Sequence, residues 1–242
     1  MLEQLPPSGV IKFASLPPIE GSQLDYGNGA ARMWVTDLPL PNPFEYWRLV
    51  NRELTSRTYC AVVFQIPVPG QAQWWRLRLL ARSAKELDGC DALRLLREMR
   101  YEVDLEELAP GSGGAVDTRV SSNRSATEAG WLAFLEVPRP ADIPFHLGLD
   151  PLYRGAPEMR SCLLRSWEER YGAFLFACSG STMTVVVERP PRSMPIARLL
   201  AREHLIFSPT TFTWTSGGSL ENVIEEVAGS LMGSVRWDFW WD

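Results

Sequence analysis

The sequence lacks the long apolar run and the basic excess that would point to a membrane or a nucleic acid. No window of about 18 apolar residues occurs, and the N-terminus carries neither a basic start nor an apolar segment of the secretory kind. Lys and Arg number 24 against 29 Asp and Glu, which gives a net charge of −5. We therefore expect no membrane and no nucleic acid among the partners of this chain.

Side chains that bind metals or surround phosphates are also scarce. The two histidines, His146 and His204, have no Cys or carboxylate residues at the spacing of a zinc site, so we expect no metal. The glycine clusters at 111–114 and 217–218 do not have the spacing of a phosphate-binding loop. We expect no cofactor.

The four cysteines are widely separated along the chain, and three of them lie in apolar or periodic segments. Such thiols usually behave as small hydrophobic side chains in the core. Cys162 and Cys178 are separated by one expected helix and a turn and could approach each other, but core thiols are the favoured interpretation. Reduced thiols are therefore expected for the four cysteines, and they indicate a cytoplasmic protein.

The residues that are present support a folded core. Hydrophobic residues make up 45% of the chain and aromatic residues 11%. Period-2 and continuous apolar runs alternate with helical periods, so we expect an α+β fold with a mixed or antiparallel sheet flanked by helices. Strands are expected at 33–36, 58–66, 131–137, 173–178, 182–188 and the C-terminus, and helices at 44–57, 86–99, 158–171, 193–205 and 219–232.

A change of composition suggests two α+β halves. Residues 110–130 are rich in Gly and Ser and have no hydrophobic period, which is typical of a flexible loop or linker. We expect an N-terminal module at 1–109 and a C-terminal module at 131–242.

The C-terminal hexad, Trp237 to Asp242, holds three Trp and one Phe. Alternation predicts a final strand with Trp237, Phe239 and Trp241 directed to the core and Trp240 directed away. The alternative is an aromatic platform for a partner. Its binding residues would be Trp237, Phe239, Trp240 and Trp241, with Trp214 from the preceding loop.

Glu203 and His204 are adjacent at the end of an expected helix. A histidine near a helix C-terminus is favoured by the helix dipole and needs no catalytic role. The alternative is a hydrolase in which this pair supplies the acid and the base. Other sequence features do not add a nucleophile or a second carboxylate at useful spacing, so a non-enzymatic role is favoured.

Four motifs in the C-terminal part occur in an order and spacing that resemble a known family. They are the runs 163–173, 187–191, 201–204 and 237–242. Together they resemble the bacterial family called domain of unknown function 4253, over about residues 140–242. That family usually carries Trp-Asn and Cys-Pro before the first helix and Cys-Pro-Asp after the Glu-His helix. Here residues 152–157 read LYRGAP and 207–210 read FSPT, so an activity that depends on those Cys and Asp residues is not implied.

These observations favour a non-catalytic, cytoplasmic protein-interaction module of bacteria, of which an immunity or toxin-neutralising protein is one form. The acidic balance of the chain suits a basic protein partner. Two alternatives stay open: the hydrolase centred on Glu203 and His204, and a structural subunit of a larger bacterial or phage assembly.

Overall fold

The structure is a computed structural model that describes residues 8–13, 16–24, 32–53, 59–65, 83–99, 103–112, 129–147, 157–179, 181–209 and 219–241. The chain divides into two compact units, each assembled from separate segments. Unit 1 is Met1–Asp88, Ser121–Leu149 and Leu175–Gly180, and unit 2 is Gly89–Val120, Asp150–Phe174 and Ser181–Asp242. The module boundaries at 109 and 131 stay a prediction, and most of the expected linker lies outside the described residues.

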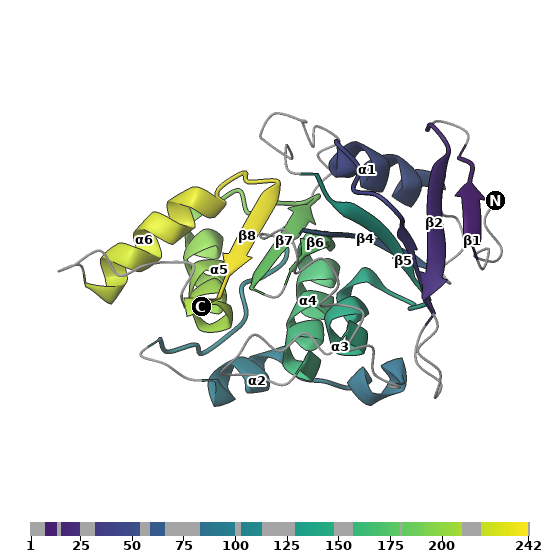
Figure 1. Ribbon diagram of the computed structural model, residues 1–242. Coiled ribbons are helices and arrows are strands. Elements are labelled where there is room, and N and C mark those ends of the chain that lie inside the picture. The colour runs from purple at the N-terminus through teal and green to yellow at the C-terminus, as the bar shows by residue number, and fades with distance from the viewer. Residues whose placement is uncertain are drawn as a thin grey trace. The chain divides into compact units, whose positions relative to one another are not determined.

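Unit 1 contains most of the sheet. Its strands run in the order β1-β2-β3-β5-β4-β6, and the neighbours from β1 to β4 are antiparallel. The pair β4–β6 is parallel, which makes the sheet mixed and the fold α+β, as expected (Figure 1). The bounds are β1 Ser8–Ile11, β2 Ile19–Leu24, β3 Met33–Thr36, β4 Cys60–Phe64, β5 Trp131–Leu135 and β6 Ala173–Cys178.

The first helix packs on this sheet through aromatic side chains. Helix α1 spans Pro43–Glu53, and the end expected at 57 lies outside the described residues. The Trp47 indole donates a hydrogen bond to the Ala61 carbonyl of β4 at 3.0 Å. The Phe44 and Trp47 rings meet Phe176 of β6 edge-on, with centroids 5.1 and 5.3 Å apart. All five residues of β4 are buried, in agreement with its continuous apolar sequence. Three further short helices are described in unit 1: η2 Ala84–Leu87, η3 Pro140–Asp142 and α3 Ile143–Leu147.

The single helix expected over 86–99 is wrong, because the chain forms η2 and then α2 at Ala92–Glu98. Gly89 has φ +74°, in the left-handed region that ends a helical turn. The Asp91 carboxylate then accepts from the Arg94 N–H at 3.1 Å and starts a new helix. The hydrophobic period across this stretch hid the break.

Unit 2 is built from helices around one antiparallel strand pair. Besides α2 it contains α4 Pro157–Tyr171, β7 Thr182–Val187, α5 Met194–Phe207, α6 Leu220–Leu231 and β8 Arg236–Trp240. Strand β8 pairs with β7 in a register that runs from Thr182 opposite Trp240 to Val186 opposite Arg236. The ends of α4, α5 and α6 lie within two residues of their expected positions.

The expected alternation in the C-terminal strand is confirmed. Trp237, Phe239 and Trp241 are 2%, 2% and 8% exposed, whereas Trp240 is 40% exposed. The aromatic hexad therefore completes the core of unit 2 with three of its rings.

The interpretation of all four cysteines as reduced thiols is wrong for two of them. Cys90 and Cys162 form a disulfide, with their Cα atoms 6.0 Å apart and 72 residues between them in the sequence. Cys60 and Cys178 are buried and form no disulfide, as expected. The error has a physical cause: hydrophobic periodicity places Cys162 on a helix face but does not reveal which segment covers that face. None of the described helices is long and apolar enough to cross a bilayer.

Candidate functional site

Glu203 lies in the last turns of α5 with its side chain fully buried. Its two carboxylate oxygens accept four hydrogen bonds from three directions. The donors are the Ala109 N–H at 2.7 Å, the Trp167 indole at 2.7 Å and two guanidinium nitrogens of Arg170 at 2.9 and 2.7 Å. Each oxygen receives one bond from Arg170 and one from another donor, so the carboxylate is fixed in one orientation.

Arg170, on α4, connects the Glu203 carboxylate to residues 103–112, which precede α4 in unit 2. Its Nη1 also donates to the Ala109 carbonyl at 2.6 Å, and its Nε donates to Ser166 Oγ at 3.1 Å. The neighbouring Tyr171 hydroxyl donates to the Pro110 carbonyl at 3.0 Å. The Ala109 backbone therefore bonds to both members of the ion pair.

His204 is enclosed by rings. It is 1% exposed, and its ring centroid lies 4.8 Å from each of the centroids of Trp167, Trp237 and Phe239. We call these three residues the His204 cage. Within the described part of the chain, neither His204 Nε2 nor the Trp237 indole nitrogen has a hydrogen-bond partner.

The electrostatic surroundings keep His204 neutral. Burial, and secondly the positive charge of Arg170, lower the pKa of the imidazole to about 3. Burial and the Glu203 charge raise the pKa of the Tyr171 phenol above its usual range. At neutral pH the cluster therefore holds one ion pair, a neutral imidazole and a neutral phenol.

The aromatic core continues from the cage toward the C-terminus. The Phe207 ring meets Trp167 and Phe239 edge-on, with centroids 5.0 and 4.9 Å apart. The Trp241 indole donates to the Phe207 carbonyl at 3.2 Å, and the Arg160 guanidinium lies 4.2 Å from a Trp241 ring centroid. Ring contacts and an indole hydrogen bond thus hold the Trp241 side chain in the core.

The structure brings five of the sequence-selected residues into one cluster and places a sixth, Trp240, apart from it. Glu203 and His204 lie with Trp237, Phe239 and Trp241 in the core of unit 2. Trp240 lies on the opposite face of β8, and Trp214 is outside the described residues.

Sequence reasoning missed Arg170, Trp167 and Ala109. The spacing of Ser166 and Arg170 on one helix face was visible, but Glu203, the ion-pair partner of Arg170, lies 33 residues after it. Ala109 acts through backbone atoms, so its side chain carries no signal for this contact. Among the described residues, no group of three or more His, Cys, Asp or Glu side chains is placed to hold a metal ion.

The fold and the cluster define an α+β protein whose C-terminal half is organised around a buried Arg–Glu pair and an aromatic core. Residues 131–242 match the model of the family described as Domain of unknown function (DUF4253), which confirms the resemblance of the four motifs and extends it to residue 131. The matched region contains Glu203, Arg170 and the His204 cage, but not Cys90 or Ala109. No curated protein and no solved structure matches the chain.

Proposed function

We propose that this chain is a non-catalytic protein-interaction module of bacteria that binds a basic protein partner. The observation that carries the proposal is the saturation of Glu203: all four of its hydrogen bonds come from the protein, and its side chain is fully buried. A general acid or base must reach the proton that it transfers. Glu203 and the enclosed His204 instead resemble a structural ion pair and a core histidine, which weighs against the hydrolase alternative.

The exposed face of β8 is the favoured contact surface. Trp240 is 40% exposed, and Asp238 lies beside it on the same face with a side chain that is 56% exposed. An exposed Trp suits a protein contact, since aromatic residues are enriched at binding hot spots. Arg236 already pairs with Asp238 on this face at 2.8 Å, so the preference for a basic partner rests on the acidic balance of the whole chain. That balance is a net charge of −5, and opposite charges speed association.

The backbone geometry of β8 indicates how a partner would bind. The Trp241 N–H donates to the Ser181 carbonyl just before β7 at 2.8 Å, and the Val235 carbonyl accepts from the Val187 N–H of β7 at 2.9 Å. In an antiparallel pair, residues bonded to the neighbouring strand alternate with residues whose backbone groups point away. Arg236, Asp238 and Trp240 therefore direct their N–H and C=O groups away from β7.

Two of these outward carbonyls already have donors. Ser234 Oγ donates to the Arg236 carbonyl and Ser208 Oγ to the Trp240 carbonyl, both at 2.7 Å. Occupied backbone groups make the addition of a partner strand less favourable. We therefore expect recognition through the side chains of β8.

The test uses the full chain and two alanine variants. The wild-type protein would be used to isolate a partner from its bacterial host, and the affinity of the purified pair would then be measured by calorimetry at low and high salt. Trp240→Ala should weaken binding at least tenfold, and salt should weaken it further. Leu38→Ala is the matched control, because Leu38 is a large hydrophobic residue of unit 1 that is 76% exposed. Equal affinity of Trp240→Ala and the wild type would overturn the proposed surface.

The finer expectations remain proposals. An immunity or toxin-neutralising role would require the partner to be a toxin that is inactive in the complex. A structural role would require the chain to co-purify with a larger assembly. A cytoplasmic location would require the Cys90–Cys162 disulfide to be transient or redox-responsive, because disulfides in the cytosol usually are.

A further inference from the structure

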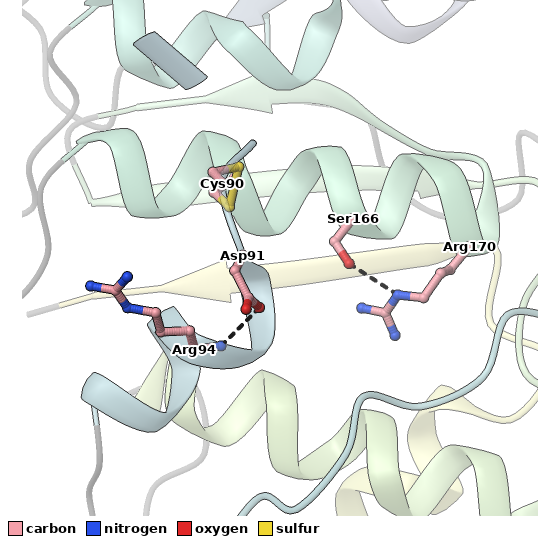
Figure 2. Close-up of a disulfide and its surroundings, with 6 residues drawn as sticks. Cys90, Asp91, Arg94, Ser166 and Arg170 are labelled. Atoms are coloured by element: carbon pink, nitrogen blue, oxygen red, sulfur yellow. Dashed lines mark hydrogen bonds between the residues drawn. A yellow bond between two sulfur atoms is a disulfide. The ribbon is translucent and has the colours of Figure 1, made fainter. Parts of the chain in front are cut away.

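The disulfide joins two parts of unit 2 that differ in their relation to the family. Cys162 belongs to the region that matches the family model, whereas Cys90 precedes that region. Cys90 lies within residues 89–99, and residues 103–112 follow later in the sequence. We call these two ranges together the α2 arm. Figure 2 shows the disulfide against α4, at the point where Asp91 begins α2.

The contacts of the α2 arm with α4 lie along a single face of that helix. Cys162, Ser166 and Arg170 are four residues apart in turn, so they lie along one side of the helix. Cys162 holds the beginning of the arm covalently, and Arg170 holds its end through the Ala109 carbonyl. Ser166 accepts from Arg170 Nε between these two points, as Figure 2 shows.

The end of the arm fits closely against α4. A Cβ atom added to Gly111 would lie 2.8 Å from the Arg170 carbonyl oxygen. Leu96, Val103 and Leu105 are buried, so the arm also contributes apolar contacts. The arm therefore lies over the buried Glu203, held by a covalent link at one end and by hydrogen bonds to α4 and α5 toward the other.

Cys90 and Cys162 differ in their exposure to solvent. Cys90 is exposed, whereas Cys162 is 2% exposed. A thiolate from solution can approach the disulfide from the side of Cys90. Exchange rates depend strongly on access to the attacked sulfur.

We propose that Cys90–Cys162 is a site of thiol–disulfide exchange that controls the attachment of the α2 arm to α4. The reactant is a dithiol reductant. Its thiolate attacks Cys90 Sγ, which forms a mixed disulfide at Cys90 and releases Cys162 as a thiolate that takes up a proton. The second thiol of the reductant then attacks the mixed disulfide. The reductant leaves as a cyclic disulfide and Cys90 becomes a thiol, so two electrons and two protons have moved to the protein.

Opening the disulfide leaves the beginning of the arm without its covalent link, while the bonds at Ala109 and Pro110 remain. The free energy of local opening should fall first for residues 91–99, which lose the covalent link. It should then fall for residues 103–112, because the residues before them are no longer held against α4. This inference goes beyond the proposed interaction surface and does not depend on it.

Hydrogen exchange followed by mass spectrometry tests the proposal on the full chain. Peptides covering 91–112 should exchange at least tenfold faster after reduction with dithiothreitol, whereas peptides covering β7 and β8 should keep their rates. Equal exchange of the arm in the oxidised and reduced protein would overturn the proposal. So would a disulfide that dithiothreitol opens only after global unfolding.

A variant and a second reagent show whether the effect of dithiothreitol comes from opening the Cys90–Cys162 disulfide. Cys90→Ser removes the link at an exposed position, and its arm should exchange like that of the reduced wild type and should not respond to dithiothreitol. Oxidised glutathione added to the reduced protein should form its mixed disulfide at Cys90. An adduct found at Cys162 first, or an arm in Cys90→Ser as protected as in the oxidised wild type, would contradict the proposal.

Discussion

Arg170 and Glu203 are joined by two parallel hydrogen bonds of 2.9 and 2.7 Å, with the carboxylate fully buried and the arginine side chain 15% exposed. A buried pair of this kind compensates the cost of removing both charges from water only while its geometry and its additional hydrogen bonds are intact. The Ala109 backbone and the Trp167 indole supply those additional bonds. The pair is therefore a structural centre of unit 2.

Glu203→Gln should lower the free energy of unfolding by about 3–5 kcal/mol, because it leaves the Arg170 charge without its buried partner. Urea denaturation measures this loss. The matched control is Glu225→Gln, since Glu225 also forms two hydrogen bonds with one arginine, Arg198, but both side chains are about half exposed. The control should leave stability unchanged within error. Similar losses in both variants would contradict a special role for burial.

Gly111→Ala should destabilise the protein by about 1–3 kcal/mol, because the added methyl group would meet the Arg170 backbone oxygen at 2.8 Å. Gly229→Ala in α6 is the control. A Cβ atom at Gly229 meets nothing within 4 Å, so the higher helix propensity of alanine should stabilise the protein by about 0.5–1 kcal/mol. Thermal unfolding of the two variants should shift in opposite directions, and a neutral Gly111→Ala would argue against close contact between the α2 arm and α4.

Trp237→Ala and Trp240→Ala should separate the two faces of β8. Trp237 is 2% exposed within the His204 cage, so its removal should cost about 3–5 kcal/mol of stability. Trp240 is 40% exposed, and its removal should cost much less. The same urea measurement tests both variants, and equal losses would mean that Trp240 is also a core residue.

His204 should make stability depend on pH below neutrality. Its pKa is about 3 in the folded chain and 6.5 in the absence of tertiary contacts. As the pH falls from 6.5 toward 3, the unfolded state binds a proton that the folded state does not, so stability decreases by about 1.4 kcal/mol per pH unit from this group. His204→Gln should show a shallower decrease by that amount in the same window. Parallel curves for the two proteins would contradict burial of the neutral imidazole.

Local patterns predicted much of unit 2. The alternation of Trp237, Phe239 and Trp241 identified the buried face of the final strand, because side chains on a strand have a strict period of two. The positions of α4 and α5 followed from helical periods that agree with their buried faces. The helix break near Gly89 could have been found from the Gly and the Asp91 cap, but the hydrophobic period concealed it.

The long-range contacts could not be predicted in the same way. The Cys90–Cys162 bond and the Arg170–Glu203 pair connect segments that are 72 and 33 residues apart. Periodicity identifies the face on which each residue lies, but the partner depends on the path of the whole chain. The contacts of Ala109 could not be predicted for a second reason, since they use only the backbone atoms that every residue has.

A titration of the His204 imidazole by NMR in the intact, isotope-labelled chain tests the central claim most directly, with His204→Gln used to assign its signals. If Glu203 and His204 form a structural core, the His204 signals should stay those of a neutral ring from about pH 7 to about pH 4. A titration midpoint near the ordinary value of 6.5 would place the imidazole in contact with solvent. That result would contradict the structural role and favour acid–base chemistry at this pair.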